Sequence, residues 1–409
     1  MLTPYRVLDL ADEKGLMCGK TLGDLGADVI KIERPGGDAA RNIGPFYHDE
    51  PHPEKSLFWF ALNTSKRGIT LNIETKDGRQ IFRRLVKTAD FVVETFAPGY
   101  LDSLGLGYQD LEKINPGVIL ISITPFGQDG PYKDYKTADI VAWALGGEMA
   151  PYGDADRPPV HFSYHSQAYL HAGLDGAQGA VTALWQRHTT GEGQQIDVSV
   201  QESVVQCLEH ITAMWDMRHV VQKRTEEQRM GAAHATRQIW PCKDGYVSWS
   251  HGGTSVLAPS LPLIKWMESE GYTNDFIKNF NWERPDFAAI PQKEMDMIEE
   301  PTGRFFLAHT KAELLDGAVK HNALLYPVST TDDMFQNVQL NAREFWSDVE
   351  HPELGVTIRY PGAFTHTTAI RPRISRRAPL IGEHNLEIYE GEMGMSRQEL
   401  VMLKQAGVI

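Results

Sequence analysis

Residues 166–187 read SQAYLHAGLDGAQGAVTALWQR, and this stretch decides the fold that we expect. Apolar side chains recur in it at alternating spacings of four and three, which predicts one apolar face of a single long helix. Ser166 is a suitable N-cap for this helix, and Arg187 suits its C-terminal end. The predicted apolar face consists of Leu170, Leu174, Ala177, Val181 and Leu184.

Three glycines, Gly173, Gly176 and Gly179, interrupt the same stretch at intervals of three residues. A glycine inside a helix costs about 1 kcal/mol relative to alanine, so three of them need a physical reason. We expect that another segment of backbone approaches the helix closely at these positions. The alternative is a glycine-rich core helix that the protein merely tolerates.

The N-terminal half alternates between strand and helix patterns. Apolar runs at 5–10 (YRVLDL) and 27–33 (ADVIKIE) predict buried strands, and residues 15–26 between them predict a helix. A strand–helix–strand unit implies parallel pairing, so we expect an α/β domain with a Rossmann-like sheet. No GxGxxG opens the first helix, so the dinucleotide fingerprint is absent. Further strands are expected at 69–71, 91–94, 118–123 and 195–200.

The C-terminal half has a different pattern. Residues 201–221 predict a second long helix, and residues 237–241 and 246–250 flank a turn that predicts a β-hairpin. Helical patterns follow at about 255–270, 296–309 and 311–322. We therefore expect a smaller α+β domain after the large one. The predicted division is 1–225 for the N-terminal part of the large domain, 226–330 for the small domain, and 331–409 for a return segment that completes the large domain.

Composition limits the classes of partner. The 409 residues have a formal net charge of −14, which argues against nucleic-acid and anionic-membrane partners, because no excess of cations is available for phosphates. The three cysteines are far apart and form no CxxC pair, so we expect neither a metal site nor a disulfide framework. No run of 18 apolar residues occurs, and we expect a cytoplasmic protein without a membrane span.

Several motifs are spread along almost the whole chain. They are VLDL at 7–10, LGADVIKIE at 25–33, NTSKRGITLNI at 63–73, ETFAPGYLDSLGLGYQDLEKINPGVILISITPFGQDGPY at 94–132, TALWQRHTTGEGQQIDVSVQES at 182–203 and RRAPLIGEH at 376–384. Together they resemble the class III CoA-transferases, the CaiB/BaiF family. The resemblance implies that family's fold, an interlocked dimer of two-domain chains. It also implies acyl-CoA and a carboxylic acid as substrates, with no permanently bound cofactor.

The resemblance also implies a missing nucleophile. In the family, an aspartate at the start of the central helix attacks the acyl-CoA thioester. Counting back from Gly173 places that position on Tyr169, whereas counting forward from the two prolines at 158–159 places it on Ala168. No Asp or Glu occurs between Asp156 and Asp175. The resemblance therefore implies no catalytic residue in this chain, with Tyr169 in the place of the aspartate.

The family's CoA-binding positions are only partly matched. Arg34 and Lys136 fit two of its cations, but Glu74 stands where a lysine is expected. Thr95 and Ser103 replace an asparagine and an arginine. These changes imply a weakened CoA site. The candidate CoA- or substrate-binding residues are Arg34, Thr95, Lys136, His165, Gln167 and Tyr169.

Two further groups of residues have alternative interpretations. Lys66 and Arg67 are either a solvated surface pair or a phosphate contact in a loop. Polar and aromatic side chains near the start of the central helix could line a substrate pocket, and His165 or His171 could act as a base there.

We therefore expect a non-catalytic subunit of a heteromeric class III CoA-transferase. It would help to move CoA between succinyl-CoA and a carboxylic acid such as benzylsuccinate, and a paralogous partner subunit would supply the aspartate. One alternative is a self-sufficient enzyme that uses Asp175 or Glu192, and another is a regulatory pseudoenzyme. The related racemases have a histidine where this chain has Ala138, which argues against racemisation.

Overall fold

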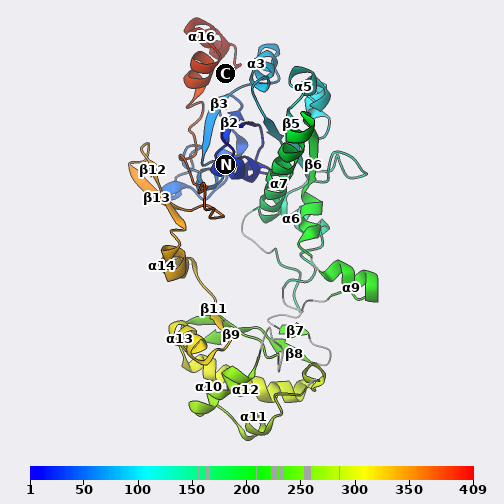
Figure 1. The fold of residues 1–409 in the computed structure, drawn as a ribbon, viewed down its shortest axis with the longest axis vertical. Coiled ribbons are helices and arrows are strands. Elements are labelled where there is room, and N and C mark those ends of the chain that lie inside the picture. Colours follow the sequence, from blue (N-terminus) through cyan, green and yellow to red (C-terminus); the bar gives the residue numbers. More distant parts are fainter. Residues whose placement is uncertain are drawn as a thin grey trace. The chain divides into compact units, whose positions relative to one another are not determined.

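The computed structural model describes residues 1–153, 156–161, 166–208, 210–222, 224, 228–230, 234–252, 259–284 and 286–409. The candidate residue His165 therefore lies outside the described residues. The chain forms two compact units, of which the large one contains 1–149, 161–217 and 340–409 and the small one contains 150–160 and 218–339. Both termini lie in the large unit (Figure 1). The domain boundaries at 225 and 330 remain a prediction.

A parallel sheet of six strands organises the large unit, in the order β3-β2-β1-β4-β5-β6 (Figure 1). Val7 in the central strand β1 pairs with Val29 of β2 on one side and with Phe91 of β4 on the other. The predicted α/β class with a Rossmann-like sheet is confirmed. The strands are β1 (Arg6–Asp9), β2 (Asp28–Glu33), β3 (Lys66–Thr70), β4 (Phe91–Glu94), β5 (Ile119–Thr124) and β6 (Gln195–Ser199).

The sheet is covered on both faces. Val7 and Phe91 point into a core with helices α1 (Leu16–Asp24) and α7 (Gln167–Thr190). The next residues along the same strands, Leu8 and Val92, point into a second core. All residues of β4 and β5 are consequently buried, which explains their continuous apolar runs. The second core is formed with α3 (Lys76–Val86), α5 (Tyr108–Ile114) and α16 (Arg397–Gln405).

The long helix α7 confirms the expected element but not its expected face. Ala177 and Leu184 are buried, whereas Leu174 and Val181 are 42% and 39% exposed. The small side chains decide the outcome, because they let α1 and the sheet approach more closely than a leucine stripe would allow. Ser166 occupies the N-cap position without forming a capping hydrogen bond, since its backbone has φ 13° and ψ 44°. The buried small residues are Ala168, Ala172, Gly173, Gly176, Ala177, Ala180 and Ala183.

The prediction of one long helix at 201–221 was wrong. The structure has α8 (Val200–Gln206) and then α9 (His210–Arg218). The Ser199 hydroxyl caps α8 by accepting a hydrogen bond from the backbone N–H of Glu202 at 3.3 Å. Buried side chains such as Val204 hold α8 in place, and Leu208 just after it is also buried. In α9, by contrast, Met217 is 80% exposed. None of the described side chains of α9 is buried, so α9 does not continue the packing of α8.

The small unit has its own core. Its β9 (Ile239–Cys242) and β10 (Gly245–Ser248) form the predicted hairpin, and β11 (Tyr326–Pro327) pairs with β10. Aromatic side chains dominate the interior, with Trp240, Trp249, Trp266, Phe305 and Phe306 among the buried residues. Its helices are α10 (Leu261–Ser269), α11 (Asp275–Asn279), η3 (Phe287–Ala289), α12 (Gln292–Ala308), α13 (Lys311–His321) and α14 (Thr331–Gln336), and β7 (Gln228–Met230) pairs with β8 (Ala235–Arg237).

Residues after the small unit return to the large one. The Tyr389 hydroxyl donates a hydrogen bond of 2.7 Å to the carbonyl oxygen of Thr70, at the end of β3. None of the described helices is both long and apolar enough to cross a membrane. The remaining elements are η1 (Ala39–Asn42), η2 (Tyr47–Asp49), α2 (Leu57–Leu62), α4 (Tyr100–Ser103), α6 (Asp139–Leu145), α15 (Val338–Ala342), β12 (Trp346–His351), β13 (Val356–Pro361) and η4 (Leu386–Glu392).

Candidate functional site

A cleft of about 570 Å³ lies at the carboxyl ends of the central strands. The strand order reverses between β1 and β4, and open α/β sheets bind ligands outside such a reversal point. Leu10 follows β1, Leu71 follows β3 and Thr95 follows β4, and all three line the cleft. The full lining is Leu10, Asp12, Ile32, Glu33, Arg34, Gly36, Gly37, Asp38, Ala39, Asn42, Pro53, Leu71, Ile73, Thr95 and Phe96.

Thr95 joins the two loops at the reversal point. Its hydroxyl donates to the Asp12 carboxylate at 2.7 Å and accepts from the Asp12 backbone N–H at 2.9 Å. The residue is 5% exposed. The loop after β4 is thereby fixed to the loop after β1. Thr95 therefore shapes the cleft, as its hydroxyl is already engaged in two hydrogen bonds.

Arg34 is the one basic residue among the described residues that line the cleft. Its guanidinium Nη2 lies 2.8 Å from the Glu74 carboxylate oxygen Oε1. The Tyr100 hydroxyl donates to the same oxygen at 2.7 Å. Burial, and then the bond to Glu74, raise the pKa of Tyr100, so the phenol stays a donor. The arginine that the resemblance assigns to CoA is thus already paired within the chain.

The acidic side chains of the cleft wall are also paired. Glu33 holds the buried Arg41 through bonds of 2.6 and 2.7 Å. Asp38 lies 3.3 Å from the ammonium of the buried Lys31. Despite burial, which lowers it, the pKa of Lys31 is raised, chiefly by the nearby Asp38. Among the described residues of the wall, each of these cations is therefore engaged by a carboxylate.

Neither interpretation of Lys66 and Arg67 was right. Lys66 is fully buried in β3, and its ammonium lies 2.8 Å from the Asp9 carboxylate. Arg67 is buried and bonded to Asp28 at 2.7 and 2.9 Å. The motif was interpreted as a loop, but β3 begins at Lys66, and the two side chains point to opposite faces of the sheet, where both are buried. They are structural cations and do not reach the cleft.

The start of α7 places Tyr169 in a buried, acidic environment. The residue is 5% exposed, and its backbone N–H donates to the Asp139 carboxylate at 3.3 Å. Burial, followed by the Glu13, Asp139 and Asp12 carboxylates, raises the pKa of Tyr169. The phenol is therefore protonated at neutral pH. Gln167, the first residue of α7, is half-buried, and neither residue lines the cleft.

Sequence reasoning missed Glu13. It lies in the loop after β1, and burial raises its pKa, with a further rise from Asp12. The available signal was an acidic pair directly after a central strand, at the edge where ligands bind. Lys136 behaves differently, since it is exposed in the loop before α6 and does not line the cleft.

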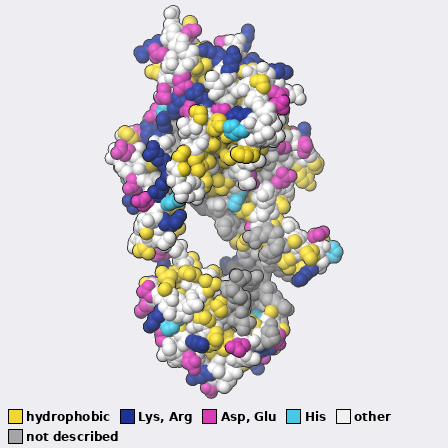
Figure 2. Space-filling model, in the orientation of Figure 1, with side chains coloured by type: hydrophobic (Ala, Val, Ile, Leu, Met, Phe, Trp, Pro, Cys, Tyr) yellow, Lys and Arg dark blue, Asp and Glu magenta, His cyan; other side chains and the backbone are white. Residues whose placement is uncertain are grey.

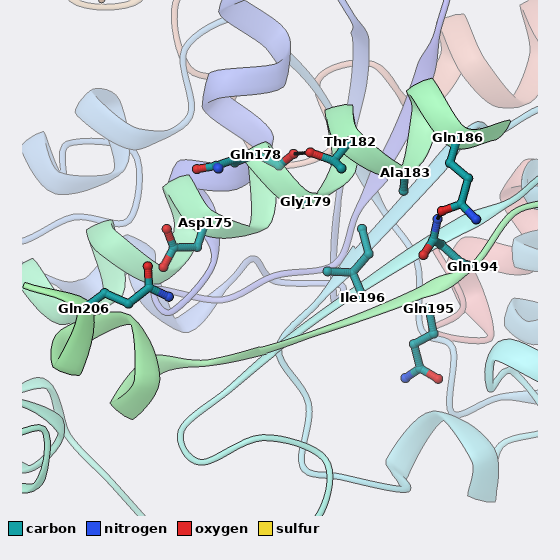
Figure 3. Close-up of a pocket in the computed structure, with 10 residues that line it drawn as sticks. All are labelled: Asp175, Gln178, Gly179, Thr182, Ala183, Gln186, Gln194, Gln195, Ile196 and Gln206. Atoms are coloured by element: carbon teal, nitrogen blue, oxygen red, sulfur yellow. Dashed lines mark hydrogen bonds between the residues drawn. The ribbon is translucent and has the colours of Figure 1, made fainter. Parts of the chain in front are cut away.

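A separate groove of about 420 Å³ lies between the outer side of α7 and β6 (Figure 3). Amide side chains dominate it, and the Gln194 amide donates to Gln186 at 2.9 Å. Asp175 lines this groove, not the cleft. The described lining contains no cation that could bind a phosphate. Its residues are Asp175, Gln178, Gly179, Thr182, Ala183, Gln186, Gln194, Gln195, Ile196 and Gln206.

Comparison with known proteins settles the family. Residues 2–385 match the sequence profile of CoA-transferase family III. The chain belongs to this family. This family is the one that the motifs resemble, and its solved structures share the fold described above.

The family's named members and solved structures cover nearly the whole chain. The chain is 34% identical to the succinyl-CoA:(R)-benzylsuccinate CoA-transferase subunit BbsE of Thauera aromatica, over 99% of this chain and 97% of that one. It is 28% identical to the succinyl-CoA–L-malate CoA-transferase beta subunit of Chloroflexus aurantiacus, over 100% and 98%. A CAIB/BAIF family protein from Brucella suis superposes with a TM-score of 0.80 at 29% identity, covering 95% and 98%.

Proposed function

We propose that this chain is a non-catalytic subunit of a heteromeric class III CoA-transferase. The observation that carries the proposal is the first turn of α7, which contains no acidic residue and has the buried Tyr169 where the family resemblance implies an aspartate. A paralogous partner subunit would supply that aspartate. This chain would contribute structural support and part of the substrate pocket.

The chemistry explains why Tyr169 is a poor substitute. Covalent catalysis by a carboxylate proceeds through a mixed anhydride and then an enzyme-bound thioester, which splits one difficult exchange into easier steps. A phenol would form an aryl ester instead. The raised pKa of Tyr169 also keeps its oxygen protonated, which weakens it as a nucleophile.

Two observations support a protein partner. Two of the similar proteins are named as subunits, BbsE and a beta subunit. In addition, α7 exposes Leu174, Val181 and Trp185 along one side, with Trp185 77% exposed. Hydrophobic side chains also gather on the face of the large unit shown in Figure 2. Exposed apolar patches commonly mark protein interfaces, and we propose an interlocked heterodimer or larger assembly.

For substrates, we propose succinyl-CoA as the donor and a carboxylic acid as the acceptor. The name of the BbsE relative suggests benzylsuccinate as the first acid to test. CoA would be a substrate and not a resident cofactor.

A self-sufficient transferase is the second candidate function, and Glu13 is the observation that favours it. The Glu13 carboxylate is one of the three carboxylates that raise the pKa of Tyr169. Glu13 therefore lies near the position of the expected nucleophile. A carboxylate at that position has the chemistry to accept the acyl group. Asp175 is a weaker candidate, because it lies in the amide-lined groove.

Expression tests separate these proposals. We expect this chain alone to be insoluble, misassembled or without CoA-transferase activity, and to become soluble and active when co-expressed with a paralogue that has the aspartate. An obligate partner often leaves no stable folded monomer. Robust transfer from succinyl-CoA by the single pure chain would refute the non-catalytic role. Purification of the chain from its native host should also bring along a family member of similar size.

A further inference from the structure

We infer that Glu74 is a specificity-determining residue that weakens the binding of polyphosphate ligands such as CoA in the cleft of this chain. The inference rests on the proposed function and deepens it, because a subunit that does not transfer CoA would also bind it weakly. The structural basis is the contact between Glu74 and Arg34, whose side chains are 48% and 65% exposed.

Glu74 is held in place from several directions. Its backbone N–H donates to the Asn72 side chain at 3.0 Å, and its carbonyl oxygen accepts from Arg79 at 2.7 Å. Its carboxylate accepts from Tyr100, which belongs to α4 on a different part of the chain. Glu74 therefore faces Arg34 as a positioned group, and Arg34 in turn lines the cleft.

The charge balance of the cleft then decides which ligands fit. Arg34 is neutralised by Glu74, and the remaining wall charges are engaged in pairs such as Glu33 with Arg41. A phosphate needs cations for charge-assisted hydrogen bonds, and it would meet the Glu74 carboxylate beside the one arginine. The apolar part of the wall, which includes Ile32, Ile73 and Phe96, remains available. The cleft thus favours an uncharged apolar group over a polyphosphate.

The expected size of the effect is modest. Exposed ion pairs are weak and are screened by salt, so Glu74 reduces CoA affinity without abolishing it. We expect Glu74→Gln to tighten CoA binding about tenfold at low salt. The substitution frees Arg34 to bind a phosphate and removes the repulsion between the Glu74 carboxylate and that phosphate. Glu74→Lys should tighten CoA binding further. Both gains should shrink as the salt concentration rises.

Calorimetric titration of the purified assembly that contains this chain tests the inference. CoA without an acyl donor is the first probe, and pantetheine, which lacks every phosphate, is the second. The matched control is Asp77→Asn, which removes one exposed acidic charge from the start of neighbouring helix α3. The inference predicts that the Kd for CoA falls at one class of sites in Glu74→Gln. The Kd for pantetheine in the same variant should change less than twofold. The Kd for CoA in the Asp77→Asn control should also change less than twofold.

Two results would overturn the inference. One is CoA binding that is equally tight in the wild type and in Glu74→Gln. The other is an equal gain for pantetheine, because the phosphates would then be irrelevant. These titrations need no turnover, so their outcome is independent of the nucleophile. If this chain carried the covalent intermediate, the proposed function would fail whatever the titrations gave.

Discussion

Gly173 of α7 lies so close to α1 that a β-carbon added to it would be 3.1 Å from the backbone nitrogen of Cys18. The same β-carbon would be 2.7 Å from the Cβ of Met17. The expected close approach of backbone is therefore found at Gly173, whereas the nearest atoms to a β-carbon added at Gly176 or Gly179 belong to side chains. The contact at Gly173 sets the position of the start of α7, and therefore of Tyr169, relative to the loop after β1.

We predict that Gly173→Ala destabilises the protein although alanine favours helices. Overpacking costs about 1–3 kcal/mol, which outweighs the gain of about 1 kcal/mol in helix propensity. The control is Gly391→Ala, where an added β-carbon meets no atom within 4 Å. Thermal unfolding of the two variants should show a lower midpoint for Gly173→Ala only. A midpoint at or above the wild-type value would contradict the close contact.

The buried pair of Lys66 and Asp9 gives a second prediction. Lys66→Met leaves the Asp9 carboxylate, which is 0% exposed, without its cation. Breaking a buried pair costs about 3–5 kcal/mol. By comparison, Arg359→Met breaks the exposed pair with Asp348 and should change stability much less, because solvent screens exposed ion pairs. Urea unfolding measures both values, and similar small losses would show that Lys66 is not a structural cation.

Glu94 predicts a pH dependence of stability. It is 5% exposed, and burial raises its pKa from 4.5 to about 7. The folded state therefore binds the proton more tightly than the unfolded state, so the contribution is fully present below pH 4.5 and is lost as pH rises through 7. Relative to the wild type, Glu94→Gln should gain on the order of 3 kcal/mol between the acidic and alkaline ends of that window. A stability difference that does not vary with pH would argue against the raised pKa.

Tyr169 should be dispensable for chemistry in the assembled enzyme. Tyr169→Phe removes only the hydroxyl, a contribution of about 1 kcal/mol, and most of the turnover should remain. Tyr169→Ala should lower the unfolding free energy by about 3–5 kcal/mol, because it leaves a void in the core. Steady-state rates and thermal unfolding of the co-expressed assembly check both variants. A loss of turnover beyond about a thousandfold in an intact Tyr169→Phe assembly would give the phenol a direct role.

The sequence predicted the elements better than their contacts. The period of α7 located the helix, and Gly173 identified the close approach of backbone, but the leucine stripe suggested the wrong face. The reason is that periodicity ranks side chains by polarity, whereas the space between α7 and α1 admits only small ones.

The candidate site shows the same limit. Arg34 and Thr95 were predicted separately, and the fold brings both to one cleft. The bond between Arg34 and Glu74 joins residues 40 positions apart, so it depends on how β2 and β3 pair. Glu13 was missed because its interaction with Tyr169 arises only when α7 packs beside the loop after β1. Charge and spacing along the chain do not contain that information.

The most direct test is to locate the covalent intermediate. The co-expressed assembly is treated with succinyl-CoA, trapped with hydroxylamine or borohydride, and analysed by peptide mass mapping of both subunits. The described α7 start offers no carboxylate before Asp175, which lies ~9 Å further along the helix axis than Tyr169. We predict a stoichiometric adduct on an aspartate of the partner, with residues 160–190 and Glu13 of this chain unmodified. A stoichiometric adduct on Glu13, Asp175 or any other residue of this chain would contradict its assignment as the non-catalytic subunit.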